Sequence, residues 1–258
     1  MINLIILIIG AFVVFVLSTI SGGGASLLLM PLIALTVGVK SVAPIMTLGI
    51  AMNSTSKVFF FWKHIDWNLF KWLFPSTIVG SILGAMMFAY LASEYLQIII
   101  GVFLIATVFQ LKEKKNKKPG FKIKLWHFIP MGFGISFLSG LIGGVGPLMN
   151  TAYLNYGMSK EGMISTRAAN AVILHITKII SYAWLGFVTG DVLMYGIIIG
   201  VSATLATYAG KLLLTKISDL IFKKIVIITM VVSGVMMLWR HKDFIGGMKD
   251  YLFANYGF

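Results

Sequence analysis

Apolar runs long enough to cross a membrane follow one another along almost the whole chain, and they constrain its fold more than any other feature. A bilayer core about 30 Å thick needs about 20 apolar residues per helix. The sequence therefore predicts an all-α integral membrane protein with no room for a separate soluble domain. The expected segments are Ile2–Ile20, Ala25–Val39, Pro44–Trp62, Leu69–Leu91, Tyr95–Leu111, Leu125–Leu141, Val145–Tyr156, Ile164–Phe187, Val192–Leu214 and Ile221–Trp239.

The composition agrees with a membrane protein. Of 258 residues, 59% are hydrophobic and only 11% are charged, and the mean hydropathy is +0.95. A water-soluble domain of this size does not have such a composition. The segment from Met1 to Ile20 lacks the basic start and the cleavage site of a signal peptide, so we expect it to remain as the first helix. The absence of cysteine excludes disulfides and thiolate metal sites, and we expect no cofactor.

Two glycine clusters interrupt the apolar runs. The first is Gly22–Gly24, in "FVLSTISGGGASLLLMP", and the second is "GGVG" at residues 143–146. Glycine costs a helix interior about 1 kcal/mol relative to alanine, so three in a row unwind at least one turn. Unwound backbone cannot face lipid, because each unpaired polar group there costs several kcal/mol. We expect both breaks to line a polar cavity, with helices restarting at Ala25 and Val145; close helix packing is the simpler alternative.

The two halves of the chain resemble each other. "FVLSTISG" (residues 15–22) and "FGISFLSG" (residues 133–140) share a phenylalanine, two serines and a glycine, and Pro31 and Pro147 follow the two glycine clusters. Each half continues with a short apolar segment and three full helices, which predicts an internal repeat. The expected division is a first membrane repeat at 1–111, a basic cytoplasmic linker at 112–124, a second repeat at 125–240 and a C-terminal tail at 241–258.

The lysines and arginines predict the orientation, because these residues accumulate on cytoplasmic loops. We place the linker "KEKKNKKPGFKIK" inside and let each glycine-broken pair enter and leave on one side, as two crossings or as a re-entrant hairpin. Most basic residues then lie inside, and only Lys40, Arg240, Lys242 and Lys249 lie outside. Each half crosses an odd number of times, so the second repeat is inverted and both termini are extracytoplasmic. The net charge of +13 then reflects orientation in the cell inner membrane rather than nucleic-acid binding.

Broken helices in inverted repeats are typical of secondary transporters, which hold their substrate near the midplane. Free N–H groups and the positive end of the helix dipole after each break favour an anion. All acidic residues lie at predicted helix boundaries or in loops, so no carboxylate is expected mid-span. The candidate substrate-binding residues are Ser21, Gly22, Gly23, Gly24, Asn53, Lys57, Ser139, Gly143, Gly144, Gly146, Asn170, His175, Lys178 and Tyr182.

Lys178 stands near the centre of a predicted helix, and the residues around it form one polar face. A buried lysine or histidine is costly in a membrane and therefore indicates a functional role. His175 can also be a satisfied core residue, and Lys57 lies near enough to the inner end for its side chain to reach water. Helical spacing places on the face of Lys178 the residues Arg167, Ala171, Leu174 and Tyr182.

At these motifs the chain resembles the sulfite exporter TauE/SafE family, also called the TSUP transporters. The resemblance covers nearly the whole chain and is carried by "STISGGGASLLLMPLIAL" (18–35), "KHIDW" (63–67), "FLSGLIGGVGPL" (137–148) and "LHITKIISYAWLG" (174–186). It implies export of sulfite, organosulfonates or other small organic anions across the bacterial inner membrane. The first repeat departs from the family pattern, because "GGG" lacks the preceding glycine pair.

Other functions fit the sequence less well. An intramembrane enzyme would need paired acids, a metal-binding histidine pattern or a serine beside a base, and none of these patterns occurs. Uptake, channel-like passage of other small organic anions, and a non-transporting membrane scaffold stay open as alternatives. The expected partners are a small anion and the lipid bilayer, and a homo-oligomer also stays open.

Overall fold

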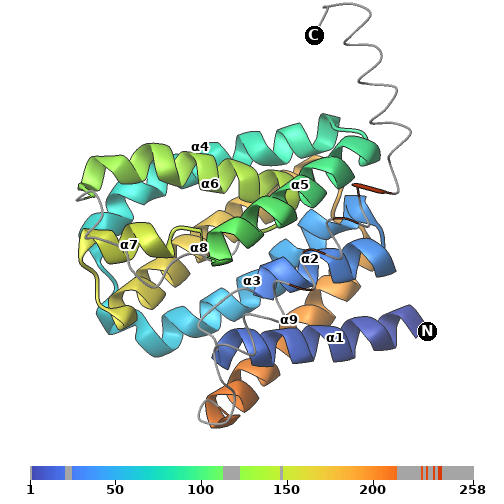
Figure 1. The fold of residues 1–258 in the computed structure, drawn as a ribbon, viewed down its shortest axis with the longest axis horizontal. Coiled ribbons are helices and arrows are strands. Elements are labelled where there is room, and N and C mark those ends of the chain that lie inside the picture. The colour runs from blue at the N-terminus through green and yellow to red at the C-terminus, as the bar shows by residue number, and fades with distance from the viewer. Residues whose placement is uncertain are drawn as a thin grey trace, which may run out of the picture.

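The computed structural model describes residues 2–20, 25–112, 123–145 and 148–213, together with Ile228, Val231, Val235, Leu238 and Trp239. This part of the chain is helical and contains no strand (Figure 1). The α-helices are α1 (Ile2–Ile20), α2 (Ala25–Thr36), α3 (Val39–Phe61), α4 (Trp67–Tyr90), α5 (Ser93–Lys112), α6 (Phe128–Ile142), α7 (Asn150–Tyr156), α8 (Lys160–Trp184) and α9 (Gly190–Leu213). Short 3-10 turns, η1 (Trp62–His64) and η2 (Leu125–His127), precede α4 and α6.

Most expected segments correspond to these helices within a few residues, but the segment from Val145 is wrong in its start. The helix of the second break begins at Asn150, and its seven residues make a short α7. Gly143 ends α6 with φ 96°, a conformation that favours glycine, and residues 144 and 145 are not helical. The first restart, at Ala25, is confirmed. The last expected helix, Ile221–Trp239, lies outside the described residues apart from isolated positions.

Three described stretches are long and apolar enough to cross a membrane, namely Trp67–Tyr90, Leu125–Ile142 and Gly190–Ala209. Many of the exposed side chains on these helices are large and apolar, as at Val79, Ile197 and Leu205, which suits a surface that faces lipid. Helices α3 and α8 are also long enough to cross a membrane. Their hydropathy is lower, because they carry several polar residues on their buried faces.

Exposed aromatic rings gather near both ends of the long helices. Trp62, Trp67 and Trp126 lie where α3 ends and where α4 and η2 begin, close in sequence to several lysines, and Tyr90 and Trp184 lie where α4 and α8 end. Tryptophan and tyrosine are enriched at the two membrane–water interfaces. The two groups of rings therefore agree with a bundle that spans a bilayer.

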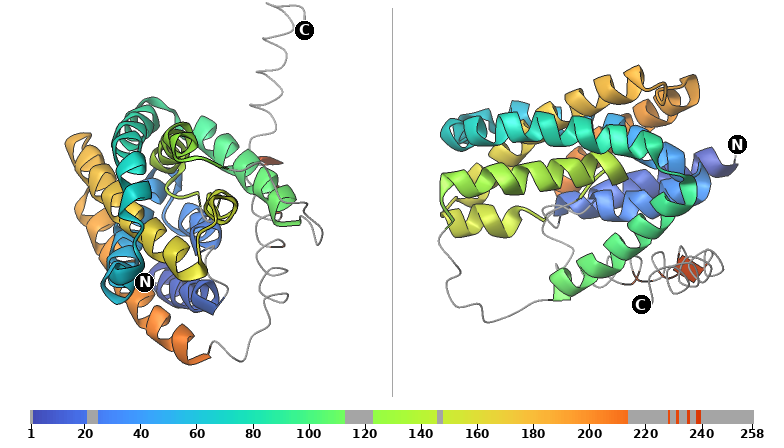
Figure 2. Two further views of the ribbon diagram at one scale, coloured as in Figure 1. Left: turned by 90° about the vertical axis from the view of Figure 1, so that its left-hand side faces the viewer. Right: turned by 90° about the horizontal axis from the view of Figure 1, so that it is seen from above.

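The bundle places α3 and α8 between two pairs of packed helices, α4 with α6 and α1 with α9 (Figure 1). In addition, α3 packs against α9, and α8 packs against α4. Each central helix therefore contacts the other central helix and one helix of an outer pair. Helix α5 runs obliquely along the outside of this arrangement (Figure 2).

Helices α4 and α6 touch backbone to backbone through small residues. A Cβ atom added to Gly140 would lie 2.8 Å from the backbone nitrogen of Ala85, and one added to Gly84 would collide with the carbonyl oxygen of Phe137. Gly132, near the start of α6, lies against the side chains of Ser76 and Leu73. These contacts advance together along both helices, so α4 and α6 run parallel, and small residues permit the close approach that membrane helices use for packing.

Candidate functional site

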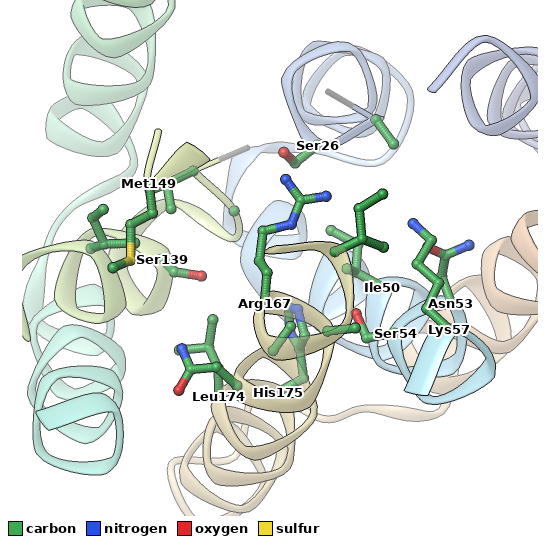
Figure 3. Close-up of a pocket in the computed structure, with 18 of the residues that line it drawn as sticks. Ser26, Ile50, Asn53, Ser54, Lys57, Ser139, Met149, Arg167, Leu174 and His175 are labelled. Atoms are coloured by element: carbon green, nitrogen blue, oxygen red, sulfur yellow. The ribbon is translucent and has the colours of Figure 1, made fainter. Parts of the chain in front are cut away.

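A small cavity lies where α3, α6 and α8 meet, and its volume is about 150 Å³. Drug-sized ligands occupy pockets of about 300–1,000 Å³, so this cavity suits a small solute or ion. Figure 3 shows Arg167 rising from α8 into the midst of the lining side chains. The cavity is lined by Phe15, Ala25, Ser26, Ile50, Asn53, Ser54, Lys57, Ile135, Ser139, Gly144, Val145, Met149, Tyr153, Ile164, Arg167, Ala168, Asn170, Ala171, Leu174 and His175.

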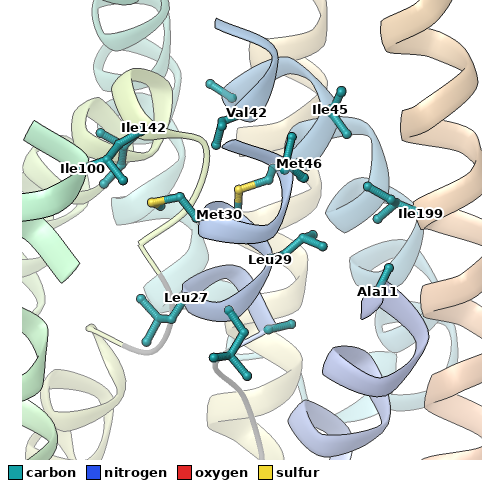
Figure 4. Packing of buried hydrophobic residues seen from close by; sticks show 14 of the residues in the cluster. Ala11, Leu27, Leu29, Met30, Val42, Ile45, Met46, Ile100, Ile142 and Ile199 are labelled. Carbon is teal, nitrogen blue, oxygen red and sulfur yellow. The ribbon is translucent and has the colours of Figure 1, made fainter. Parts of the chain in front are cut away.

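Two clusters of apolar side chains border this cavity. The larger apolar cluster is centred on α2 and α3, where Leu29, Met30 and Met46 are buried (Figure 4). The smaller cluster joins α4, α6, α7 and α8 and includes Phe128 and Tyr153. Polar groups on the cavity wall are therefore bordered by apolar side chains, and beside these each hydrogen bond and charge carries more weight than in water.

The central helices contribute lining residues at the same spacing. Helix α3 provides one set, Ile50, Asn53, Ser54 and Lys57, and α8 provides a matching set, Arg167, Asn170, Ala171 and Leu174, in addition to Ile164, Ala168 and His175. Both sets follow the i, i+3, i+4, i+7 pattern of one helix face. Asparagine occupies the second position in both, so the two amides face one cavity from two helices.

Each asparagine is fixed by a threonine on a neighbouring helix. Asn53 Nδ2 donates to Thr207 Oγ1 of α9 at 2.7 Å, and Thr77 Oγ1 of α4 donates to Asn170 Oδ1 at 2.9 Å. Because the carbonyl oxygen of Asn170 is engaged, its NH₂ group is left to donate toward the cavity. The polar pairs join α3 to α9 and α4 to α8.

Ser139 presents a second oriented donor. Its hydroxyl oxygen accepts a hydrogen bond from Lys178 Nζ at 3.2 Å. The hydroxyl proton makes no other hydrogen bond within the described part of the chain, so it is free to donate to a solute in the cavity. Ser139 is 1% exposed, and it stands one turn before the break that ends α6.

Lys178 lies beside the cavity but not on its wall. Its side chain is fully buried, and Nζ also donates to the carbonyl oxygen of Gly143 at 2.8 Å. One turn further along α8, the Tyr182 hydroxyl donates to the carbonyl oxygen of Gly140. The two side chains thus bind carbonyl groups at the end of α6, which would otherwise be unpaired in an apolar region.

Two cationic side chains do line the cavity. Arg167 Nη1 donates to Asn150 Oδ1 of α7 at 2.7 Å, which holds the guanidinium group across the helix break. Lys57 is half-buried on α3. No aspartate or glutamate occurs among the described residues of the wall. The described acidic side chains sit at helix starts instead; Asp66, for example, caps α4 by accepting from Leu69 N at 3.0 Å.

His175 adds a polar group with unused hydrogen-bonding capacity. The side chain is 3% exposed, and its Nδ1 atom has no partner among the residues that the structure describes. An unpaired buried polar atom is costly, so such an atom on a cavity wall indicates a place for a ligand or water.

The structure brings together six of the candidate residues on the cavity wall: Asn53, Lys57, Ser139, Gly144, Asn170 and His175. Gly143, Lys178 and Tyr182 lie next to it, and Ser21, Gly22, Gly23, Gly24 and Gly146 lie outside the described residues. The candidate set omitted Arg167, although its helix face was recognised. It also omitted Ser26, Ser54 and Tyr153, for which the sequence contains no signal beyond a polar group in an apolar helix.

A second cavity of about 310 Å³ lies where the turn before α4 meets the turn before α8. Lys63, His64 and Asp66 line one side, and Tyr156 and Ser159 line the other. This second cavity lies at the end of the bundle where α8 begins. Arg167 follows on α8 a few residues after the residues that line it. This end also carries Lys63 and Lys71.

These features define the class of the protein: a helical membrane protein with a small cavity lined by hydrogen-bond donors and cations. The sequence profile of the sulfite exporter TauE/SafE family matches residues 6–237. The chain therefore belongs to this family of membrane transporters, as the sequence motifs predicted. Comparison with curated proteins found no match, and comparison with solved structures found none either.

Proposed function

We propose that the protein is a secondary transporter that exports small anions, sulfite or an organosulfonate, across the bacterial inner membrane. The observation that carries this proposal is the small cavity with two cations, two oriented donors and no carboxylate among its described residues. Hydrogen bonds from charged donors are the strongest that an oxyanion can receive. The same wall would repel a cationic solute.

The transport mechanism that we infer uses two inverted repeats, at 1–111 and 125–240, joined by the cytoplasmic linker 112–124 and followed by the tail 241–258. Matched contacts support it: α4 packs on α6 as α9 packs on α1, and α3 packs on α9 as α8 packs on α4. The Asn53–Thr207 and Asn170–Thr77 pairs join equivalent helices in this scheme. A site between such repeats becomes accessible to each side in turn when the repeats rock against each other.

The position of the cations supports a cytoplasmic entrance. Helix α3 ends beside the start of α8, because the Asp66 backbone nitrogen donates to Thr166 Oγ1 at 2.9 Å. Lys57 lies late in α3 and Arg167 early in α8, so both mark the end of the cavity near the second cavity and the cytoplasmic lysines. An anion in the cytoplasm would meet this positive end first, and both chain termini would be extracytoplasmic.

Binding and flux measurements on the purified protein test the proposal. We expect sulfite or sulfoacetate to bind in detergent and to cross proteoliposome membranes, whereas a cation of similar size does neither. Asn170→Leu removes an oriented donor and should weaken anion binding about tenfold, while Lys71→Gln, on the exposed surface of α4, should not. Folded protein that binds none of sulfite, sulfoacetate, taurine and malonate would contradict the proposal.

A further inference from the structure

The cavity wall contains a pair of cations on two different helices. Lys57 belongs to α3 and Arg167 to α8, and the charge of Arg167 acts on Lys57. They differ in how they are held. Arg167 is tied to Asn150, whereas no described residue forms a hydrogen bond or ion pair with the ammonium group of Lys57.

Both charges lie at one end of the cavity. Helix α3 ends next to the start of α8, where Gly162 faces the carbonyl oxygen of His64. In the two matched sets, Lys57 stands last on α3 and Arg167 stands first on α8. Two helices that run in opposite directions bring these positions to the same level.

The opposite end of the cavity lacks such a pair of charges in the two matched sets. The residues that take the equivalent places in the two matched sets are Ile50 on α3, which corresponds to Arg167, and Leu174 on α8, which corresponds to Lys57. The helix backbones are thus arranged alike at both ends of the cavity, but only one end has charged side chains. The fold alone therefore does not require a pair of cations at these positions.

Two like charges facing one small cavity repel each other, and the surrounding apolar clusters screen them poorly. The described part of the wall offers no carboxylate to compensate them, and its remaining polar groups are neutral amides, hydroxyls and an imidazole. A solute with one negative charge neutralises half of the pair. A solute with two negative charges neutralises all of it.

We propose that Lys57 and Arg167 form a subsite that selects anions with two negative charges over anions with one. This inference rests on the proposed function, since it assumes that the cavity binds the transported anion. Arg167 is the fixed member, and Lys57 moves to complete the contact. The class of substrate is then a dianion, such as fully ionised sulfite or a carboxylated sulfonate, in preference to a simple alkanesulfonate.

Pairs of anions that differ mainly in charge test the inference. Sulfate and methanesulfonate form one pair, and sulfoacetate and 2-hydroxyethanesulfonate form the other, in each case the dianion first. Titration calorimetry in chloride-free, mildly alkaline buffer should give the dianion of each pair about tenfold or more the affinity of the monoanion. Lys57→Gln should lower dianion affinity about tenfold and monoanion affinity much less, which removes the discrimination.

Two controls accompany this variant. Lys57→Arg keeps the charge and should keep the discrimination. Lys71→Gln makes the same change of net charge on the exposed surface of α4 and should leave every affinity unchanged. Thermal unfolding verifies that each variant is folded. If Lys57→Gln fails to fold, the affinities of the unaltered protein for the two anions of each pair still show whether it prefers dianions.

The outcomes separate this inference from the proposed function. Equal affinity for the members of each pair, or an equal loss of both in Lys57→Gln, would overturn the dianion subsite while leaving anion transport standing. Absence of binding by all four anions and by sulfite would contradict anion transport itself. Discrimination that disappears in Lys57→Gln and persists in Lys57→Arg would support both.

Discussion

The ammonium nitrogen of Lys178 lies 2.8 Å from the carbonyl oxygen of Gly143, the residue at which α6 ends. A positive charge at the C-terminal end of a helix is favourable, because the helix dipole is negative there. The same ammonium group donates a hydrogen bond to the hydroxyl oxygen of Ser139, and this hydroxyl faces the cavity. Lys178 thus joins the helix break to the cavity wall without lining the cavity itself.

Lys178→Met should therefore reduce both stability and anion affinity. Loss of the two hydrogen bonds leaves a buried carbonyl group unpaired, which costs about 1–3 kcal/mol. Thermal unfolding of the purified protein measures the loss of stability, and titration with sulfite measures the affinity. Lys71→Met, at an exposed position of α4, is the matched control and should change neither.

Tyr182→Phe separates support of the break from contact with the anion. The substitution removes only the hydroxyl that donates to Gly140, one turn beyond Lys178 and away from the cavity wall. We expect a loss of stability of about 1–2 kcal/mol with little change in anion affinity. If Tyr182→Phe abolished binding while the unfolding temperature stayed constant, the tyrosine would be a substrate contact instead.

Gly84→Ala should be among the most damaging single substitutions in α4. Its added methyl group would meet the carbonyl oxygen of Phe137, which α6 cannot move without separating the two helices. Gly134→Ala on α6 is the control, because nothing lies within 4 Å of its added methyl group. We expect Gly84→Ala to lose about 2–4 kcal/mol or to fail to fold, and Gly134→Ala to match or slightly exceed the stability of the unaltered protein. Equal unfolding temperatures for the two variants would contradict the tight contact of α4 with α6.

Thr77→Val tests whether the neighbouring helix orients the amide of Asn170. Valine keeps the shape of threonine but cannot donate to Asn170 Oδ1, so the amide becomes free to turn. Anion affinity should fall about three- to tenfold. Thr47→Val is the control, since the Thr47 hydroxyl donates only to Ala43 of its own helix at 2.7 Å. Unchanged affinity in Thr77→Val would remove the Asn170 amide as an oriented donor.

The sequence was sufficient to place most of the described helices, because the length of an apolar run and the position of a glycine break can be read from neighbouring residues alone. It misplaced the restart after the second break, since apolar composition does not reveal where an unwound segment ends. The polar face of α8 followed from helical spacing. Spacing cannot tell which groups on that face meet a cavity: Arg167, which was not among the candidates, lines it, whereas Lys178 lies beside it.

The threonines that fix the two asparagines were out of reach of sequence reasoning. Hydroxyl groups in apolar helices commonly bond to a carbonyl of their own helix, as Thr47 does. Nothing in the sequence distinguishes Thr77, whose partner lies on another helix far along the chain. The recognition of such a pair depends on which helices pack together, and that packing is a property of the whole fold.

Cysteine labelling tests the orientation on which the proposed direction of export depends. The chain contains no cysteine, so single substitutions report without interference. Lys124→Cys lies at the end of the basic linker and Thr189→Cys lies before α9, and both positions are exposed. In intact cells a membrane-impermeant thiol reagent should label Thr189→Cys and spare Lys124→Cys, which reacts only after the membrane is opened. The reverse pattern would place the cationic end of the cavity outside and would favour uptake over export, because the positive end would then meet anions from the other side.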